Sequence, residues 1–232
     1  MTKTVVITGA NRGIGFELVK CYLANGDWQI IAACRTPQKA TALNDLADAT
    51  DGDIEVVQLD VSSAQSVEAF SKAIGDRPID ILVNNAGVIG GEHQSLGDID
   101  YDEWMETLSI NTLGPIRVTE ALIENIRKSK NGKIVAISSQ LGAMQYQTQG
   151  RFAYNSSKAA LNRTMTLLAN QLRAENIAVA MYHPGWVQTD MGGQAADITP
   201  PQSASGLYQC FEKLSLADSG KFFKWNGEPH AW

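Results

Sequence analysis

Tyr154 and Lys158 stand four residues apart in the segment Tyr154-Asn-Ser-Ser-Lys158. In a helix this spacing places both side chains on one face, one turn apart. A free tyrosine has a pKa of about 10 and exchanges protons poorly at neutral pH, whereas a nearby ammonium favours the phenolate and lowers that pKa. The pair could therefore pass a proton to or from a bound substrate. The alternative is an ordinary tyrosine and lysine on a solvated helix.

A second motif, Thr8-Gly-Ala-Asn-Arg-Gly-Ile-Gly15, lies between a predicted strand and a predicted helix. Gly9 allows a tight turn, Gly13 lets the backbone approach a pyrophosphate, and Gly15 lets the helix pack close to the sheet. The helix N-terminus then presents N–H groups to phosphates. Three glycines alone can form a simple turn, but the strand before them and the helix after them predict a dinucleotide-binding loop.

The elements that must position these residues alternate between strands and helices. Short apolar runs predict strands at residues 5–7, 29–33, 54–59, 79–83, 133–137, 177–181 and 221–224. Helical patterns lie between these strands. The first ends at Asn25-Gly26, the second runs from a Thr36-Pro37 cap to about 49, and the third follows a cap at Ser62 or Ser63. The others cover 102–128 with a bend at Gly114-Pro115, Tyr154 to about 175, and 201–214. This alternation predicts an α/β fold with a seven-stranded parallel sheet flanked by helices on both faces. We expect one doubly wound Rossmann-type domain over residues 1–232, with ligands at the carboxyl ends of the strands.

Composition excludes several classes of function. The chain has 232 residues, 44% hydrophobic and 19% charged, with a net charge of −6 and no basic run. Nucleic acids and anionic membranes are therefore not expected partners. Cys21, Cys34 and Cys210 are widely spaced and predict free thiols, and neither His93 nor His183 has metal-ligand spacing. The sequence shows no signal peptide and no membrane-spanning run, so we expect a cytoplasmic protein without a metal.

The pattern TGxxxGxG combined with Tyr-xxx-Lys resembles the short-chain dehydrogenase/reductase family over nearly the whole chain. Further matches, in the family's order, are Asp60, Asn84-Asn-Ala-Gly87, Asn111, Ser139, and Pro184-Gly185 followed by Thr189. The resemblance implies a cofactor site made by Gly9, Asn11, Arg12, Gly13, Ile14, Gly15, Arg35, Asp60, Val61, Asn84, Ala86, Gly87, Tyr154, Lys158, Pro184, Gly185, Val187 and Thr189.

Two arginines indicate which nicotinamide cofactor to expect. The second strand ends in Ala33-Cys34-Arg35-Thr36, without the acid that would bind a free ribose 2′-hydroxyl. Arg35 and Arg12 would instead attract a 2′-phosphate, and Thr36 could add a hydroxyl. NADPH is the expected cofactor, with NADH as the alternative. If both arginines are only solvated surface residues, this preference disappears.

The resemblance also implies catalytic roles. Tyr154 would give a proton to the carbonyl oxygen of the substrate, Ser139 would donate a hydrogen bond to that oxygen, and Lys158 would lower the Tyr154 pKa and bind the nicotinamide ribose. Asn111 would hold a water that links Lys158 to solvent. Ser138 is the alternative donor, because neighbours in a strand face opposite sides; the family pattern favours Ser139. Thr189 would contact the nicotinamide carboxamide, or else cap a helix.

Residues 183–193 and the tail 223–232 resemble the C-factor and Sniffer-type carbonyl reductases. This resemblance implies NADPH-dependent reduction of aldehydes or ketones and leaves the natural substrate, the stereochemistry and the physiological direction open. The segment at 190–204, expected to form a substrate lid, is short and predicts an open cleft. A slightly long interval before Tyr154 places an insertion at 144–150, which we expect to line the substrate cleft.

Two other classes of function compete with a carbonyl reductase. C-factor-like relatives are linked to signalling, so the chain could bind the nucleotide as a regulator with weak or no turnover; the complete set of Asn111, Ser139, Tyr154 and Lys158 favours an enzyme. A sugar-nucleotide epimerase is disfavoured, because the chain lacks TGxxGxxG and a longer C-terminal region. The helix from Asn155 has a moderately apolar second face, which leaves a homodimer or homotetramer as a hypothesis.

Overall fold

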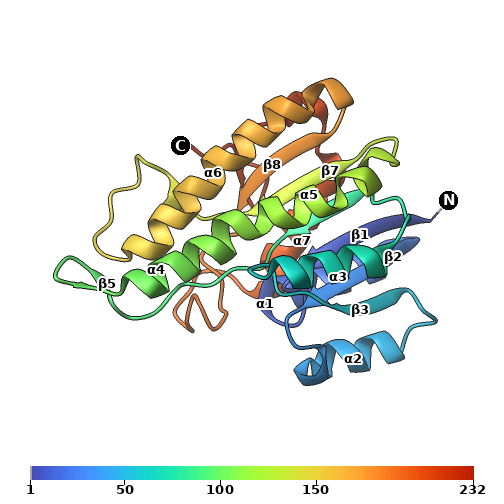
Figure 1. The fold of residues 1–232 in the computed structure, drawn as a ribbon, viewed down its shortest axis with the longest axis horizontal. Helices are drawn as coiled ribbons and strands as arrows, with labels where there is room; N and C mark the ends of the chain where they lie inside the picture. The colour runs from blue at the N-terminus through green and yellow to red at the C-terminus, as the bar shows by residue number, and fades with distance from the viewer. Residues whose placement is uncertain (1) are drawn as a thin grey trace.

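Seven parallel strands form the central sheet of the computed structural model, which describes residues 2–232 (Figure 1). They are β1 (Lys3–Thr8), β2 (Trp28–Cys34), β3 (Ile54–Gln58), β4 (Ile81–Asn84), β7 (Lys133–Ile137), β8 (Ala178–His183) and β9 (Phe222–Lys224). Their order is β3-β2-β1-β4-β7-β8-β9, and each neighbouring pair is parallel. The order reverses between β1 and β4, which is where ligands bind in doubly wound sheets. The predicted fold class and its seven strands are confirmed.

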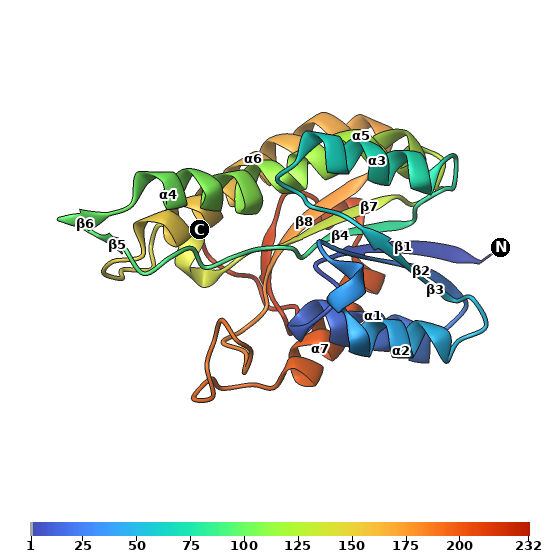
Figure 2. The same cartoon turned by 60° about the horizontal axis from the view of Figure 1, so that its bottom comes forward.

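Helices cover both faces of this sheet, as Figure 2 shows. One layer contains α3 (Ala64–Ile74), α5 (Gly114–Arg127) and α6 (Phe152–Leu172), with α4 (Tyr101–Leu108) beyond the end of α5. The other contains α1 (Gly13–Ala24), α2 (Thr41–Asp48) and α7 (Pro200–Lys213). None of the helices within residues 2–232 has the length and apolar character needed to span a membrane.

The alternation of side chains along the strands divides the interior into two cores. Val5 and Ile7 pack with Tyr22 of α1, whereas Val6 packs with Phe70 of α3 on the opposite face. All five side chains are almost fully buried. A strand buried on both faces must be apolar at every position, which explains why the strands are evident as short apolar runs.

Two predicted helix starts differ from the structure. Thr36 does not cap α2: residues Pro37–Lys39 form a separate 3₁₀ turn, and Ala40, at φ −91° and ψ 53°, interrupts the helical path. For α3 the prediction left two serines open. Ser63 is the cap and accepts the N–H of Ser66, while Ser62 bonds to Asp60.

The bend between α4 and α5 lies just before the predicted position. Residues Ser109–Leu113 form a π-helical turn that joins α4 to α5, and Gly114-Pro115 follows it. Such wide turns occur often at functional sites because they reorient side chains within a continuous helix. Here the turn contains Asn111, one of the predicted catalytic residues.

A small hairpin, β5 (Gln94–Ser95) with β6 (Asp98–Ile99), was not predicted. It lies near α4 and the start of α6, at the end of the molecule away from the N-terminus (Figure 1). Its polar residues show neither a strand nor a helix period. The predicted lid at 190–204 also needs correction, because Thr199 caps α7 and residues 200–204 belong to that helix.

Candidate active site

A cavity of about 690 Å³ opens at the carboxyl ends of the strands. Its walls come from the loops that follow β1, β2, β3, β4 and β8, from the end of β7, from the π-helical turn and from the first turns of α6. The predicted residues that line it are Gly9, Asn11, Arg12, Gly13, Ile14, Gly15, Arg35, Asp60, Val61, Ala86, Gly87, Tyr154, Lys158, Pro184 and Thr189. The structure therefore brings the glycine loop and the Tyr154–Lys158 pair to the same cavity.

The glycine loop is fastened to the segment that follows β4. The hydroxyl of Thr8 accepts the N–H groups of Asn85 and Ala86 at 3.0 and 2.9 Å, and the Asn85 amide donates to the carbonyls of Thr8 and Gly9. Gly9 has φ +66°, and a Cβ there would lie 2.9 Å from the Ala86 Cα. A Cβ on Gly15 would lie 2.3 Å from the Gly9 carbonyl oxygen. No larger side chain fits either position without displacing backbone, so the cradle requires glycine.

Asn85, rather than the predicted Asn84, lines the cavity. Asn84 is the last residue of β4, and its buried side chain donates to the Thr119 hydroxyl on the α5 side of the sheet at 3.4 Å. Adjacent residues at a strand end face opposite sides, so only one of the two asparagines can reach the cleft. Of the other predicted cofactor residues, Gly185 and Val187 do not belong to the cavity lining, and Val187 is buried.

Lys158 is buried beside Tyr154. Its Nζ donates to the Ile137 carbonyl at 2.9 Å and lies 5.9 Å from the centroid of the Tyr154 ring. Burial lowers the pKa of Lys158 to about 8, because an ammonium in a poorly solvated site is disfavoured.

The pKa of Tyr154 departs from the prediction. Burial raises it, while a hydrogen bond with Ser139 and the charge of Arg151 act in the opposite direction. The predicted net lowering of the Tyr154 pKa is therefore wrong: desolvation of the phenolate outweighs the hydrogen bond with Ser139 and the charge of Arg151.

The two adjacent serines point to different partners. Ser138 donates its hydroxyl to Asn162 Oδ1 at 2.6 Å, within the buried side of α6. Ser139 begins the 3₁₀ turn after β7, where its Oγ accepts the Leu141 N–H at 3.1 Å and faces Tyr154. The structure thus places Ser139 beside Tyr154, although Ser138, and not Ser139, belongs to the lining of the cavity.

Asn111 lies directly behind the cavity wall and is fully buried. Its side chain accepts the Val88 N–H and donates to the Val88 carbonyl, both at 2.8 Å, and also donates to the Ser157 hydroxyl at 3.0 Å. A Cβ on Gly87 would come within 3.1 Å of Asn111 Oδ1 and 3.5 Å of Lys158 Nζ. Asn111 therefore ties the loop after β4 to α6.

Positive side chains gather at the end of the cavity next to β2. Arg35 lines it together with Thr36 and Lys39. Lys39 was not predicted; the 3₁₀ turn that the sequence pattern missed carries it back toward the cleft. Arg12 lies across the cavity and pairs with Asp190 at 2.5 Å, with both side chains mostly exposed.

The loop after β8 closes on itself beside the cavity. The Gln188 N–H donates to the Ile198 carbonyl at 2.9 Å, and the Ile198 N–H donates to the Trp186 carbonyl at 3.1 Å. Thr189 lies in this loop, lines the cavity and accepts the Gly192 N–H, so it caps no helix. Residues 144–150, expected to line the substrate cleft, are mostly exposed and do not contribute to the cavity lining.

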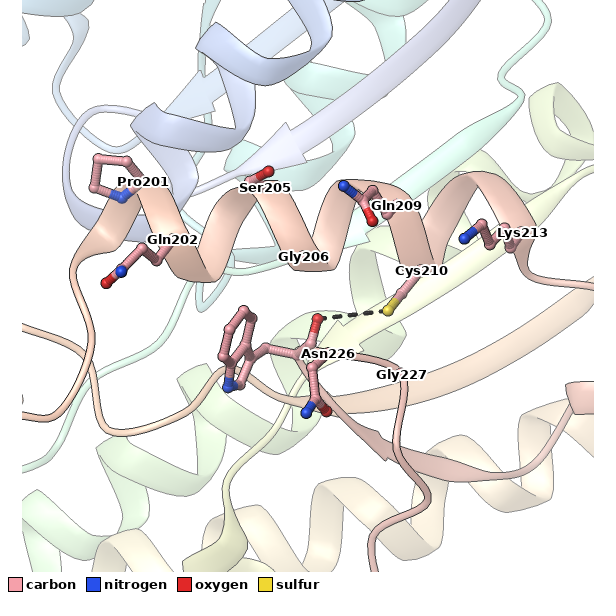
Figure 3. Close-up of a pocket in the computed structure, with 10 residues that line it drawn as sticks. Pro201, Gln202, Ser205, Gly206, Gln209, Cys210, Lys213, Asn226 and Gly227 are labelled. Atoms are coloured by element: carbon pink, nitrogen blue, oxygen red, sulfur yellow. Dashed lines mark hydrogen bonds between the residues drawn. The ribbon is translucent and has the colours of Figure 1, made fainter.

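A second cavity, of about 580 Å³, lies between α7 and the turn after β9 (Figure 3). Gly206 of α7 approaches Trp225 closely, and the Cys210 thiol donates to the Trp225 carbonyl at 3.5 Å. No predicted site residue lines this cavity. The chemistry suggested by the motifs is therefore confined to the first one.

Comparisons with known proteins identify the family of this chain. The family model described as short chain dehydrogenase matches residues 3–198. The chain is 38% identical over 167 residues to the C-signal of Myxococcus xanthus, covering 72% of this chain and 100% of the relative. It is similar to the solved carbonyl reductase Sniffer of D. melanogaster, with a TM-score of 0.93, 30% identity and 100% of both chains covered. It is also similar to an NADPH-bound carbonyl reductase from chicken fatty liver, with a TM-score of 0.93, 31% identity and coverage of 100% of this chain and 99% of that chain. The chain belongs to the short-chain dehydrogenase family of oxidoreductases.

Proposed function

We propose that this protein is an NADPH-dependent reductase of aldehyde or ketone carbonyls. The observation that carries the proposal is that Tyr154 and Lys158 line the same cavity as the glycine loop. The cavity suits a dinucleotide, because the glycine loop that lines it joins β1 to the N-terminus of α1, where a doubly wound fold holds a pyrophosphate. The carbonyl reductases Sniffer and that of chicken, the latter solved with NADPH, support the reaction class.

NADPH, when bound, supplies the hydride that reduces the carbonyl carbon. Tyr154 is the proposed proton donor, and its hydroxyl is protonated at neutral pH, as is that of an ordinary tyrosine with a pKa of about 10. Ser139, beside that hydroxyl, holds the carbonyl oxygen and stabilises the charge that develops there. The ammonium of Lys158 stabilises the phenolate that remains after the proton leaves.

Asn111 has a different part in this scheme. Both ends of its side chain are engaged with Val88 and Ser157. Asn111 therefore holds the loop after β4 against α6, and the water expected to link it to Lys158 stays a prediction. The loop from Trp186 to Ile198 is our proposed substrate lid, since its closed base lies beside Thr189 at the rim of the cavity.

The test of this function is NADPH oxidation by the purified protein with a panel of aldehydes, diketones and quinones, together with identification of the alcohol products. We expect turnover of several carbonyl compounds. Tight binding of NADPH without turnover of any member of the panel would contradict the proposal.

That second outcome would favour the other candidate, a nucleotide-binding signalling protein. The similarity to the C-signal of Myxococcus xanthus is the observation in its favour. A signalling protein need not keep a proton donor beside a buried lysine, so the intact pair is the reason that we rank the reductase first.

Cofactor preference should depend on the cations next to β2. Arg35→Ala is expected to weaken NADPH binding about 10- to 100-fold, because it removes a charge-assisted hydrogen bond to the 2′-phosphate. NADH has no such phosphate, so its binding should remain nearly unchanged. Lys39→Ala should act in the same direction. The Kd values for both cofactors provide the measurement, with the exposed Arg163→Ala as the matched control. Equal losses for NADPH and NADH would show that these side chains do not recognise the 2′-phosphate.

The two serines should separate catalysis from stability. Ser139→Ala is expected to lower kcat about 10²-fold, as for the removal of a donor to a developing oxyanion. Ser138→Ala should retain most of the turnover and lose about 1 kcal/mol of stability, because the buried Asn162 amide loses its hydroxyl donor. Steady-state kinetics and urea denaturation of both variants check this pair. The reverse pattern would assign the catalytic hydroxyl to Ser138.

A further inference from the structure

We propose that Gln94, on the hairpin that the sequence did not predict, is a positioning residue that holds Tyr154 in place for proton transfer. The proposal rests on the proposed function in one respect, the role of Tyr154 as proton donor. The structural part of the proposal is that Gln94 caps the helix that carries Tyr154, and it rests on the hydrogen bonds of the Gln94 side chain.

The first turn of α6 needs such a cap. The first N–H groups of a helix have no partner within the helix. Arg151, which precedes α6, adopts the left-handed conformation at φ 52° and ψ 44° and offers no side-chain cap. The first N–H bonded within this turn is that of Asn155, which donates to the Arg151 carbonyl at 2.9 Å. The N–H of Tyr154 donates instead to Gln94 Oε1 at 3.0 Å, across 60 residues of sequence.

The other end of the same side chain holds the loop after β4. Gln94 Nε2 donates to the Gly91 carbonyl at 2.6 Å and to the Ile89 carbonyl at 2.9 Å. These two carbonyls fix the orientation of the amide, because only its nitrogen can donate to them. The Gln94 residue is only 7% exposed, so its polar groups depend on these partners. One buried amide thus connects the loop that follows Gly87 to the backbone of Tyr154.

The surroundings are built tightly around this amide. Gly90 has φ +81°, and a Cβ there would lie 3.1 Å from Gln94 Nε2 and 2.8 Å from the Thr107 hydroxyl. The hairpin fixes the backbone of Gln94 by pairing it with Ile99. His93 Nδ1 also lies 2.9 Å from Asp98 Oδ1 across the hairpin. The hairpin therefore has a structural purpose: it presents one side chain to the start of α6.

The expected effect is on kcat rather than on cofactor affinity. Gln94 does not line the cavity, so its loss should not remove a contact to NADPH. Without the cap, the first turn of α6 can shift, and a displacement of about 1 Å between reacting groups can cost about 10²-fold in rate.

Three variants of the full-length protein test the proposal, each with saturating NADPH and the best carbonyl substrate. Gln94→Met keeps the length of the side chain and removes both its acceptor and its donor. Gln94→Glu keeps an oxygen for the Tyr154 N–H, removes the donor and adds a negative charge that faces the Ile89 and Gly91 carbonyls. Gln171→Met makes the same change at an exposed position on α6 and is the matched control.

We expect kcat to fall about 10- to 100-fold in Gln94→Met, with the Kd for NADPH within about twofold of wild type. Gln94→Glu should recover part of the lost kcat, and Gln171→Met should behave as wild type. Amide hydrogen exchange gives a readout that does not need turnover: the Tyr154 N–H should exchange faster in Gln94→Met and remain protected in Gln94→Glu.

Two outcomes would overturn the proposal. Wild-type kcat in Gln94→Met would show that the cap does not position Tyr154. Unchanged exchange of the Tyr154 N–H would show that the cap does not exist in solution. If Gln94→Met does not fold, Gln94→Glu provides the test. An equal fall in kcat and in NADPH affinity would show that Gln94 supports folding and does not position Tyr154. If the wild-type protein turns over no carbonyl compound, the proposed function is wrong. The exchange rate of the Tyr154 N–H still tests whether Gln94 caps α6 in solution.

Discussion

Tyr154→Phe is expected to lower kcat for carbonyl reduction about 10³-fold, within the range of 10²- to 10⁴-fold that a positioned general acid contributes. The substitution removes one oxygen and keeps the ring that packs near Lys158. NADPH affinity should therefore remain close to that of wild type. The measurement is steady-state NADPH oxidation together with the Kd for NADPH by fluorescence.

Tyr101→Phe is the matched control for this variant. Tyr101 is 68% exposed on α4, stacks on Trp104 and does not line the cavity. Its variant should keep wild-type kcat. If Tyr154→Phe also kept wild-type kcat, the proton would have to come from another group, and the proposed mechanism would be wrong.

Lys158→Met is expected to abolish most of the turnover and yet to stabilise the protein at pH 7 in the absence of added cofactor. Turnover falls because the phenolate of Tyr154 loses its positive partner. Stability rises because burial penalises the charged lysine, whose pKa drops from 10.5 to about 8. That shift corresponds to about 3 kcal/mol. Loss of the hydrogen bond to the Ile137 carbonyl offsets about 1 kcal/mol, so we expect a net gain of about 1–2 kcal/mol.

The pH dependence of this gain has a definite sign. Below pH 8 the lysine is charged in both the folded and the unfolded protein, and the full penalty is present. Between pH 8 and about 10.5 the unfolded chain binds more protons than the folded one, so wild type gains stability as the pH rises. The advantage of Lys158→Met should shrink across this window.

Urea denaturation at several pH values measures the gain, with the exposed Lys130→Met as control. A variant less stable than wild type at pH 7 would show that the hydrogen bond of Lys158 outweighs its desolvation. This trade between stability and activity is common where a site keeps a buried charge for its chemistry.

The sequence predicts most of the fold because the relevant signals are local. Strands such as β1 and β7 are buried on both faces and are therefore continuous apolar runs. The glycine loop was predictable because Gly9 and Gly15 sit where only glycine fits. The pairing of Tyr154 with Lys158 follows from helical spacing alone.

The parts that the sequence did not predict depend on tertiary contacts. Nothing in the spacing of Gln94 shows that its amide reaches Tyr154. Lys39 reaches the cavity only because a 3₁₀ turn replaces the expected start of α2. The direction of the Tyr154 pKa depends on how deeply the hydroxyl is desolvated, which a helical wheel cannot show.

The division of the interior into two cores has a consequence for how this protein can change. α6, which carries Tyr154 and Lys158, rests on the core shared with α3 and α5. α1, whose N-terminus follows the glycine loop, rests on the opposite core with α7. Under the proposed function, a substitution beneath α6 would alter the alignment of Tyr154, and one beneath α1 would alter the glycine loop, because the sheet separates the two cores. Substitutions in the core beneath α1 are therefore expected to change cofactor affinity without moving Tyr154, whereas those beneath α6 are expected to change both rate and affinity, because α6 also carries Lys158, the expected ligand of the nicotinamide ribose.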